Sequence, residues 1–313
     1  MVKLGSKYTF RISGMTQDGC GISFTEGVKV FIEGVLPGEV VEGKIIKITD
    51  EYAAAVVDNI ISVVTERTEP FCTHYQVCGG CTLQHIPYLY QLKLKTQVVK
   101  EALERVGGLD YGLLHDTIGM ESPKNYRNKA LYPAGIFDNR IAVGFYETRS
   151  HNVVDVNNCG VQHSTNSLVS EAVADLLNDS GIQTYNRQRG EGLIRHVVVR
   201  TSFKTGEAMV VLVINGDQLP GSHKLIDYLQ KAVPQVSSIY LNVNREVTSN
   251  VMGAHNILLY GKPAIMDFIG RFSFEISPLS FYQVNPVQTE VLYDRVKAFA
   301  GLTSSETVLD LYC

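Results

Sequence analysis

The sequence has no apolar run that approaches eighteen residues, about the length an apolar helix needs to cross a bilayer. Its start shows no long apolar core of the kind a secretory leader carries, because residues 1–6 lead directly into alternating polar and apolar positions. Internal repeats and low-complexity tracts are also missing. These absences argue against a membrane protein and against a disulfide-stabilised secreted protein, and they predict a cytoplasmic protein in a reducing compartment.

An excess of positive charge is missing as well. The 313 residues hold 28 Lys and Arg against 32 Asp and Glu, a formal net charge of −4. A uniformly basic surface is therefore not expected, and any contact with RNA must come from local clusters. A hydrophobic content of 45 % with 19 % charged residues is typical of a folded protein of two or three domains, with no obligate protein partner evident.

Three of the six cysteines lie within ten residues, and the turn between the last two is Gly-Gly. The cysteines in question are Cys72, Cys78 and Cys81, with Cys159 following far downstream. A Gly-Gly turn lets backbone amides approach sulfur atoms without crowding by Cβ. One triplet with one remote cysteine is closer to iron–sulfur ligation than to the paired ligands of structural zinc. We expect an iron–sulfur centre, with zinc and inert buried thiols as alternatives; in a shared centre the sulfurs lie within roughly 7 Å of each other.

The N-terminal residues predict a small β-barrel of the OB kind. Alternating runs at 28–32 and 40–48 are separated by turn signals such as Asp18-Gly19 and Pro37-Gly38. Barrels of this kind often bind single-stranded nucleic acid, although a barrel that only packs against its neighbour is also open.

The middle of the chain predicts an α+β region. Pro87 opens a helical pattern that Gly107-Gly108 ends, and residues 125–260 then alternate strands and helices. The strongest hairpin signal joins residues 194–201 to 208–215.

The last forty residues predict a helix and then a strand. Asn285-Pro286 is typical of a helix cap followed by the first helical residue, and Gly301 ends the pattern. The apolar run at 307–313 predicts a buried parallel strand, and without a partner strand in this sequence it should be poorly packed or engaged with another molecule.

These pieces in this order resemble the RNA (uracil-5-)-methyltransferase family, in particular members with a TRAM domain and an iron–sulfur cluster. Residues 5–60 look like TRAM, the four cysteines match the cluster ligands in spacing, and Ser280–Asn285 matches the Phe-Gln-Asn motif of the family. Residues 310–313 look like the start of its S-adenosylmethionine motif, without the glycine-rich turn.

The resemblance implies a multidomain fold. An OB- or TRAM-like β-barrel would span 1–62, and an iron–sulfur-bearing, RNA-binding α+β domain would span 63–86 and 120–275. Residues 87–119 and 276–313 would begin a Rossmann-like methyltransferase domain.

The resemblance also implies a chemistry and its cofactors. In the family a cysteine adds to carbon six of uracil, carbon five takes the methyl group of S-adenosylmethionine, and a base removes the carbon-five proton. Both groups lie beyond the motif at which this chain ends, so we expect a truncated, inactive chain without catalytic residues. Gln283 and Tyr312 would contact S-adenosylmethionine, and the four cysteines would hold a 4Fe-4S cluster. Cys313 and Cys20 are expected to be ordinary small residues.

Local basic patches predict the RNA contacts, although such residues are often merely solvated. The favoured positions are Arg127, Lys129, Arg195 and His196, with Lys124, Arg187, Arg189 and Arg200 nearby. By resemblance the RNA is rRNA more than tRNA. A radical methylthiotransferase is disfavoured, because its cysteine spacing and TRAM position differ. A non-enzymatic RNA-binding module stabilised by zinc or a cluster remains the alternative.

Overall fold

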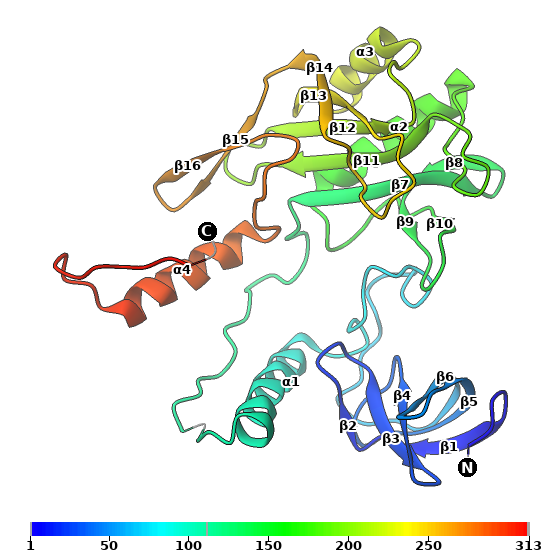
Figure 1. The fold of residues 1–313 in the computed structure, drawn as a ribbon, viewed down its shortest axis with the longest axis vertical. Coiled ribbons are helices and arrows are strands. Elements are labelled where there is room, and N and C mark those ends of the chain that lie inside the picture. Colours follow the sequence, from blue (N-terminus) through cyan, green and yellow to red (C-terminus); the bar gives the residue numbers. More distant parts are fainter. Residues whose placement is uncertain (1, 111, 312–313) are drawn as a thin grey trace. The chain divides into compact units, whose positions relative to one another are not determined.

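A computed structural model describes residues 2–110 and 112–311, and the chain divides into two compact units (Figure 1). Unit 1 comprises Met1–Glu121 with Tyr146–Ser150, and unit 2 comprises Ser122–Phe145 with His151–Cys313. The predicted division into three domains has other boundaries and stays a prediction. Among the residues described, no helix is long and apolar enough to cross a membrane.

A six-stranded sheet forms the first part of unit 1 (Figure 1). Its strands are β1 (Lys7–Arg11), β2 (Gly14–Met15), β3 (Gly21–Thr25), β4 (Val28–Ile32), β5 (Val40–Ile48) and β6 (Ala53–Ser62), in the order β1-β5-β6-β4-β3-β2. The sheet curls, since β1 also lies close to β3. A Cβ on Gly43 would meet the Val56 carbonyl oxygen at 2.5 Å, so β5 bends where only glycine fits. The predicted all-β unit is confirmed, and its TRAM relationship stays a prediction.

One helix follows the sheet in unit 1. Helix α1 (Tyr88–Glu101) begins after Pro87 and continues as one π-helical turn, η1 (Ala102–Val106). Gly107 ends it and Gly108 adopts a φ of 60°, which confirms the predicted start and stop.

A second six-stranded sheet forms the centre of unit 2. The strands are β7 (Lys129–Phe137), β8 (Arg140–Val143), β11 (Ile194–Thr201), β12 (Ala208–Ile214), β13 (Val236–Val243) and β14 (His255–Gly261), in the order β14-β13-β12-β11-β7-β8. Between β8 and helix α2 (Ser164–Ser180) the chain forms two short strands, β9 (Phe145–Tyr146) and β10 (Val153–Val154). β12 and β13 are parallel and the other pairs are antiparallel, and the predicted β11–β12 hairpin is confirmed.

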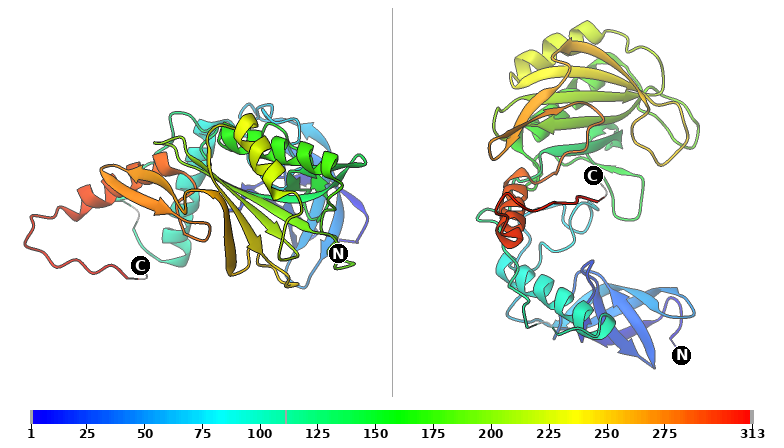
Figure 2. Two further views of the ribbon diagram at one scale, coloured as in Figure 1. Left: turned by 90° about the horizontal axis from the view of Figure 1, so that it is seen from above. Right: turned by 60° about the vertical axis from the view of Figure 1, so that its left-hand side comes forward.

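Both faces of the middle of this sheet are covered. Helices α2 (Ser164–Ser180) and α3 (Ser222–Ala232) lie side by side on one face (Figure 2). The hairpin of β15 (Ile265–Ile269) and β16 (Phe272–Ile276) packs against the other. Because β12 meets both layers, all of its residues are buried, as is typical of a strand with two covered faces.

The C-terminal part of unit 2 confirms one prediction and corrects another. Helix α4 (Pro286–Ala300) begins after Asn285, whose side chain accepts the Gln288 amide, and ends at Gly301 in the left-handed region. The predicted strand at 307–313 is wrong for residues 307–311, which form no strand and are exposed. Residues 307–311 have neither a paired edge nor a covered face, which agrees with the expected poor packing. Tyr312 and Cys313 lie outside the residues that the structure describes.

Candidate functional site

Arg67 holds the start of the cysteine-rich segment to the curled sheet of unit 1. Its Nε and Nη2 atoms donate to the two carboxylate oxygens of Glu39, each at 2.7 Å, and Nη2 also donates to the Gly34 carbonyl at 2.8 Å. The Glu39 side chain is fully buried and accepts the Leu36 amide at 2.8 Å. Burial alone would raise the pKa of Glu39, but the bonds from Arg67 and Leu36 outweigh it and lower that pKa.

The cysteine loop, residues 71–84, is built from tight turns. The Cys78 amide donates to the His74 carbonyl at 2.8 Å, and the Gly80 amide donates to Cys78 Sγ at 3.4 Å. A Cβ on Gly80 would itself lie 3.4 Å from that sulfur. The predicted approach of a backbone amide to a cysteine sulfur in the Gly-Gly turn is confirmed.

The segment Tyr146–Ser150 pairs with this loop. Thr148 donates its amide to the Val77 carbonyl at 2.8 Å, and Gly79 donates its amide to the Tyr146 carbonyl at 3.0 Å. A side chain at position 79 would stand 3.4 Å from that same carbonyl oxygen, so glycine permits the close approach.

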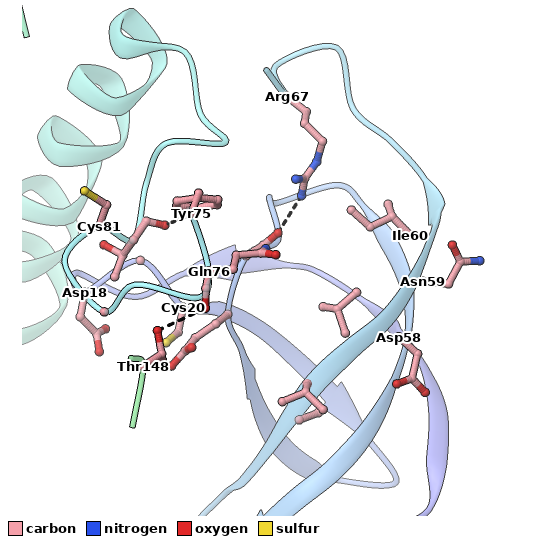
Figure 3. Close-up of a pocket in the computed structure, with 18 residues that line it drawn as sticks. Asp18, Cys20, Asp58, Asn59, Ile60, Arg67, Tyr75, Gln76, Cys81 and Thr148 are labelled. Atoms are coloured by element: carbon pink, nitrogen blue, oxygen red, sulfur yellow. Dashed lines mark hydrogen bonds between the residues drawn. The ribbon is translucent and has the colours of Figure 1, made fainter. Parts of the chain in front are cut away.

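A pocket of about 750 Å³ lies between β6 and the cysteine loop, and Cys20 and Cys81 both line it (Figure 3). Burial raises the pKa of the Cys20 thiol, which keeps it protonated and agrees with its expected ordinary role. In the wall of the pocket, the Tyr75 hydroxyl lies 2.7 Å from the Thr82 carbonyl and 2.6 Å from His85 Nδ1. Burial lowers the pKa of His85 to about 4, so this imidazole is neutral at physiological pH.

The four predicted cluster ligands are distributed over both units. The loop of unit 1 carries three of them, and Cys159 lies in unit 2 before α2, where its carbonyl accepts the Gln162 amide at 3.1 Å. All four side chains are half-buried. Across residues 2–110 and 112–311, no three His, Cys, Asp or Glu side chains lie close enough together to hold a metal ion. The donor atoms have suitable chemistry, but the structure does not show the four-ligand arrangement, and the cluster stays a prediction.

In unit 2, Asn128 connects the start of β7 to the loop that carries Gln283. Its amide donates to the Val284 carbonyl at 3.0 Å, and its Nδ2 donates to the Gln283 carbonyl at 2.9 Å. The Asn128 carbonyl accepts the Thr201 amide at 2.8 Å, which ties β11 to the same point. Asn128 is buried and Gln283 is exposed, so the backbone of this loop is fixed while the Gln283 side chain stays accessible.

Arg200 fixes the other end of that loop. Its Nη2 donates to the Pro278 carbonyl at 3.0 Å and to the Ser280 carbonyl at 2.7 Å. Burial lowers the pKa of Arg200 to about 10, which still leaves the guanidinium charged at neutral pH. Arg200 therefore positions the loop, and the RNA contact that its basic patch predicts stays a prediction.

Two further cations flank Asn128. Arg127 and Lys129 are half-buried, and Lys129 lies directly opposite Arg200 in the β7–β11 register. Burial, followed by the charges of Arg200 and Arg127, lowers the pKa of Lys129. Within the described part of the chain, neither Arg127 nor Lys129 pairs with a carboxylate. This end of the sheet therefore carries uncompensated positive charge that can attract an anion.

The other two predicted RNA contacts have different surroundings. Arg195 is 8 % exposed, and its Nη1 donates to the Asn244 and Glu246 carbonyls at 2.7 and 2.8 Å. Burial and then the Arg195 charge lower the pKa of the half-buried His196 to about 4. A guanidinium bonded to two carbonyls and a neutral imidazole are poor phosphate ligands, so both residues have an internal role, and their RNA contact stays a prediction.

The sequence did not indicate a role for Asn128, which connects the predicted cofactor residue Gln283 to the predicted RNA-binding residues Arg127 and Lys129. Its signal was a small amide side chain between two cations, Arg127 and Lys129, just before an apolar strand. Such a residue often bonds to backbone groups at a strand end, but no sequence pattern names a partner 155 residues away.

No family model matches the chain. An "Uncharacterized RNA methyltransferase" of Caldanaerobacter subterraneus subsp. tengcongensis is 44 % identical over 311 residues, which cover 99 % of this chain and 69 % of the relative. One of Clostridium tetani is 41 % identical over 312 residues, covering 100 % of this chain and 68 % of the relative.

One solved structure has the same fold over most of the chain. It is the Pyrococcus abyssi tRNA (uracil-54, C5)-methyltransferase in complex with S-adenosyl-L-homocysteine, with a TM-score of 0.72 and 23 % sequence identity. The match covers 93 % of this chain and 64 % of that protein.

Fold and sequence together thus define a methyltransferase of several structural units. The chain belongs to the family of RNA methyltransferases that these relatives represent, which confirms the predicted resemblance at that level. It spans about two thirds of their length. The comparisons support neither the expected truncation nor the expected inactivity, and both stay predictions.

Proposed function

We propose that this chain acts in the S-adenosylmethionine-dependent methylation of uridine at carbon five in RNA. Its family membership supports RNA methylation, and the shared fold with a uracil-C5 methyltransferase agrees with uridine as the target. The resemblance favours rRNA, whereas the structural neighbour acts on tRNA, so both RNAs belong in the assay.

The observation that carries this proposal is the contact between Asn128 and Gln283. A methyl donor and its acceptor must meet, so a cofactor-binding residue and RNA-binding residues should lie next to each other. The 2.9 Å bond from Asn128 Nδ2 to the Gln283 carbonyl brings the loop of the proposed cofactor residue beside Arg127 and Lys129. These residues are far apart in the sequence, and the fold joins them at one end of the sheet.

Each group has a distinct part in the proposal. S-adenosylmethionine would supply the methyl group, and the exposed Gln283 amide would hold it through hydrogen bonds. Arg127 and Lys129 would bind RNA phosphates, since they carry charge without a carboxylate partner in the described part of the chain. We assign neither a nucleophile nor a base to this chain.

The test combines binding with product analysis. Arg127→Ala and Lys129→Ala should each weaken RNA binding and lower the slope of log affinity against log salt by about one. Arg140→Ala is the control, because this exposed arginine on β8 lies opposite the end of β7, whereas Lys129 lies at its start. The protein purified from its native gene, given rRNA or tRNA, should form 5-methyluridine. RNA binding without methyl transfer would favour the non-enzymatic RNA-binding module.

We further propose that Cys72, Cys78, Cys81 and Cys159 hold a 4Fe-4S cluster. The amide-to-sulfur bond from Gly80 to Cys78 supports this, because such bonds stabilise thiolates that ligate clusters. Protein purified without oxygen should be brown and absorb visible light, whereas a zinc protein should be colourless. Bound zinc without iron would contradict the cluster and leave the proposed methylation standing.

A further inference from the structure

The loop between β13 and β14, residues 244–254, is held from beneath by buried asparagines. Asn242 Oδ1 accepts the Gly253 amide at 2.7 Å, and Asn242 Nδ2 donates to the Gly253 carbonyl at 2.8 Å. Asn244 Nδ2 donates to the carbonyls of Asn250 and Val251 at 2.9 and 3.0 Å. The two asparagines thereby fix both the middle and the end of the loop.

Arg195 fixes the beginning of the same loop. Its Nη1 bonds to the Asn244 and Glu246 carbonyls, and its guanidinium lies 4.5 Å from the centre of the Tyr185 ring. A guanidinium that is buried, stacked and doubly bonded holds its loop in one conformation.

The outer side of this loop is polar and exposed. Residues 245–250 are all exposed, and even the apolar Val247 has 69 % of its surface in solvent. Ordering an exposed loop costs conformational entropy, and here hydrogen bonds from three buried polar side chains to the loop backbone offset that cost. A loop that is rigid before it meets a ligand binds with less entropic loss, so this construction favours a recognition role.

A pocket of about 590 Å³ opens between this loop and the loop that carries Gln283. Among its lining residues are Asp217, Glu246, Asn250, Met252, His255 and Leu279. Leu279 lies between Pro278 and Ser280, the two residues that Arg200 holds by their carbonyls. The pocket therefore borders the proposed cofactor loop within unit 2.

The charges around this pocket favour a base over a phosphate. The Arg245 guanidinium is paired with Asp217, and in the described part of unit 2 the Glu246 carboxylate has no cationic partner. A free carboxylate repels phosphate, yet it accepts hydrogen bonds from an amino group on a base. Met252 and Leu279 supply apolar surface for the flat face of such a base.

We propose that this pocket takes one unpaired RNA base that carries an exocyclic amino group, next to the target uridine. Glu246 and Asn250 would bond to its edge, and the pocket would thereby contribute to the choice of RNA. This inference rests on the proposed function, because it assumes that RNA is the substrate.

The experiment measures binding of the 313-residue chain to labelled oligomers of C, A or U, each of about twelve nucleotides, by fluorescence anisotropy. Glu246→Gln should weaken binding of the C and A oligomers roughly tenfold, and binding of the U oligomer less than about twofold. Glu171→Gln, an exposed carboxylate on α2, is the matched control and should change nothing. Asn250→Ala tests the second edge contact with the same oligomers.

The outcomes separate this inference from the proposed function. Unchanged binding in Glu246→Gln, or an equal loss for all three oligomers, would overturn the base pocket. If Lys129→Ala still weakens every oligomer, the proposed RNA function survives that result. If no oligomer binds to the wild-type chain, the base pocket is overturned together with RNA binding by this chain.

Discussion

Arg67 and Glu39 form a bidentate ion pair, with two hydrogen bonds of 2.7 Å between residues 28 positions apart. Glu39 directly precedes β5, and Arg67 lies just before the cysteine loop. The ion pair therefore joins the curled sheet to that loop within unit 1. Because the Glu39 side chain has no exposed surface, the carboxylate depends on Arg67 for its charge balance.

Removing that cation should destabilise unit 1 strongly. We expect Arg67→Met to lower the free energy of unfolding by about 3 kcal/mol, because a buried carboxylate is left without its partner. Lys7→Met is the control, since Lys7 pairs with Asp58 through side chains that are 61 % and 31 % exposed, and its loss should cost less than about 1 kcal/mol. Urea denaturation measures both. Equal, small losses in the two variants would contradict the buried role of Arg67.

His85 should make the stability of unit 1 depend on pH. Its pKa is about 4 in the folded state against an ordinary value of 6.5, so between these values the unfolded chain binds a proton that the folded chain does not. Its stabilising contribution is complete above pH 6.5 and is lost as the pH falls towards 4, by up to about 3 kcal/mol.

Substitution tests that assignment. His85→Asn should reduce the pH dependence of the free energy of unfolding between pH 4 and 6.5. The part of that dependence that comes from His196 in unit 2 should remain. His223→Asn, at an exposed position on α3, is the matched control for replacing a histidine by an asparagine. A profile that stays steep in His85→Asn would show that His85 is not the titrating group.

Local signals were enough to predict where elements begin and end. The cap at Asn285, the proline after it and the glycine at 301 each act within one helical turn, and the structure confirms them. The run at 307–311 fails for the opposite reason, since a strand exists only where a neighbour supplies hydrogen bonds. The apolar pattern predicts that these residues would be buried, but it does not identify the surface that would bury them.

Basic residues show the same limit. Arg127 and Arg195 look alike in the sequence, yet Arg195 is held by carbonyls 49 and 51 residues away. A pattern of charges along the chain cannot distinguish a guanidinium that faces solvent from one that bonds to a distant loop. The contact between Asn128 and Gln283 was hidden for the same reason, because both partners are polar residues whose meeting depends on the whole sheet.

Arg195 on β11 bonds to distant carbonyls, whereas Lys129 on β7 does not pair with a carboxylate in the described part of the chain. We therefore expect opposite effects on stability and RNA binding when each is replaced. Arg195→Met should lower the free energy of unfolding of unit 2 by about 2 to 3 kcal/mol, since it leaves two carbonyls without their donor and removes a stacked charge. Lys129→Met should leave stability within about 0.5 kcal/mol and weaken RNA binding. Urea denaturation and filter binding on the same preparations separate the roles. A stable Arg195→Met with weak RNA binding would support the predicted RNA contact of Arg195.

The cysteine loop should depend on its thiols through structure and not through redox chemistry. The proposed methylation of uracil involves no net oxidation or reduction, so a bound cluster would organise residues 71–84. Cys78→Ser should lower the folding yield or RNA affinity, whereas Cys20→Ser, a protonated thiol outside the loop, should not. Thermal melting and RNA binding provide the measurement. Unchanged values in Cys78→Ser would argue against an organising role.

The bond between Asn128 and Gln283 can be tested without any ligand. Asn128→Asp replaces the Nδ2 donor by an oxygen that faces the Gln283 carbonyl, so an attraction becomes a repulsion at one atom pair. We expect amide hydrogen exchange in residues 280–285 to rise roughly tenfold, while exchange in the core of β12 stays slow. Asn139→Asp is the matched control, because it makes the same chemical change in an exposed turn between β7 and β8. If exchange in 280–285 does not respond, Arg200 alone must hold the loop, and the proposed meeting of cofactor and RNA residues loses its main support.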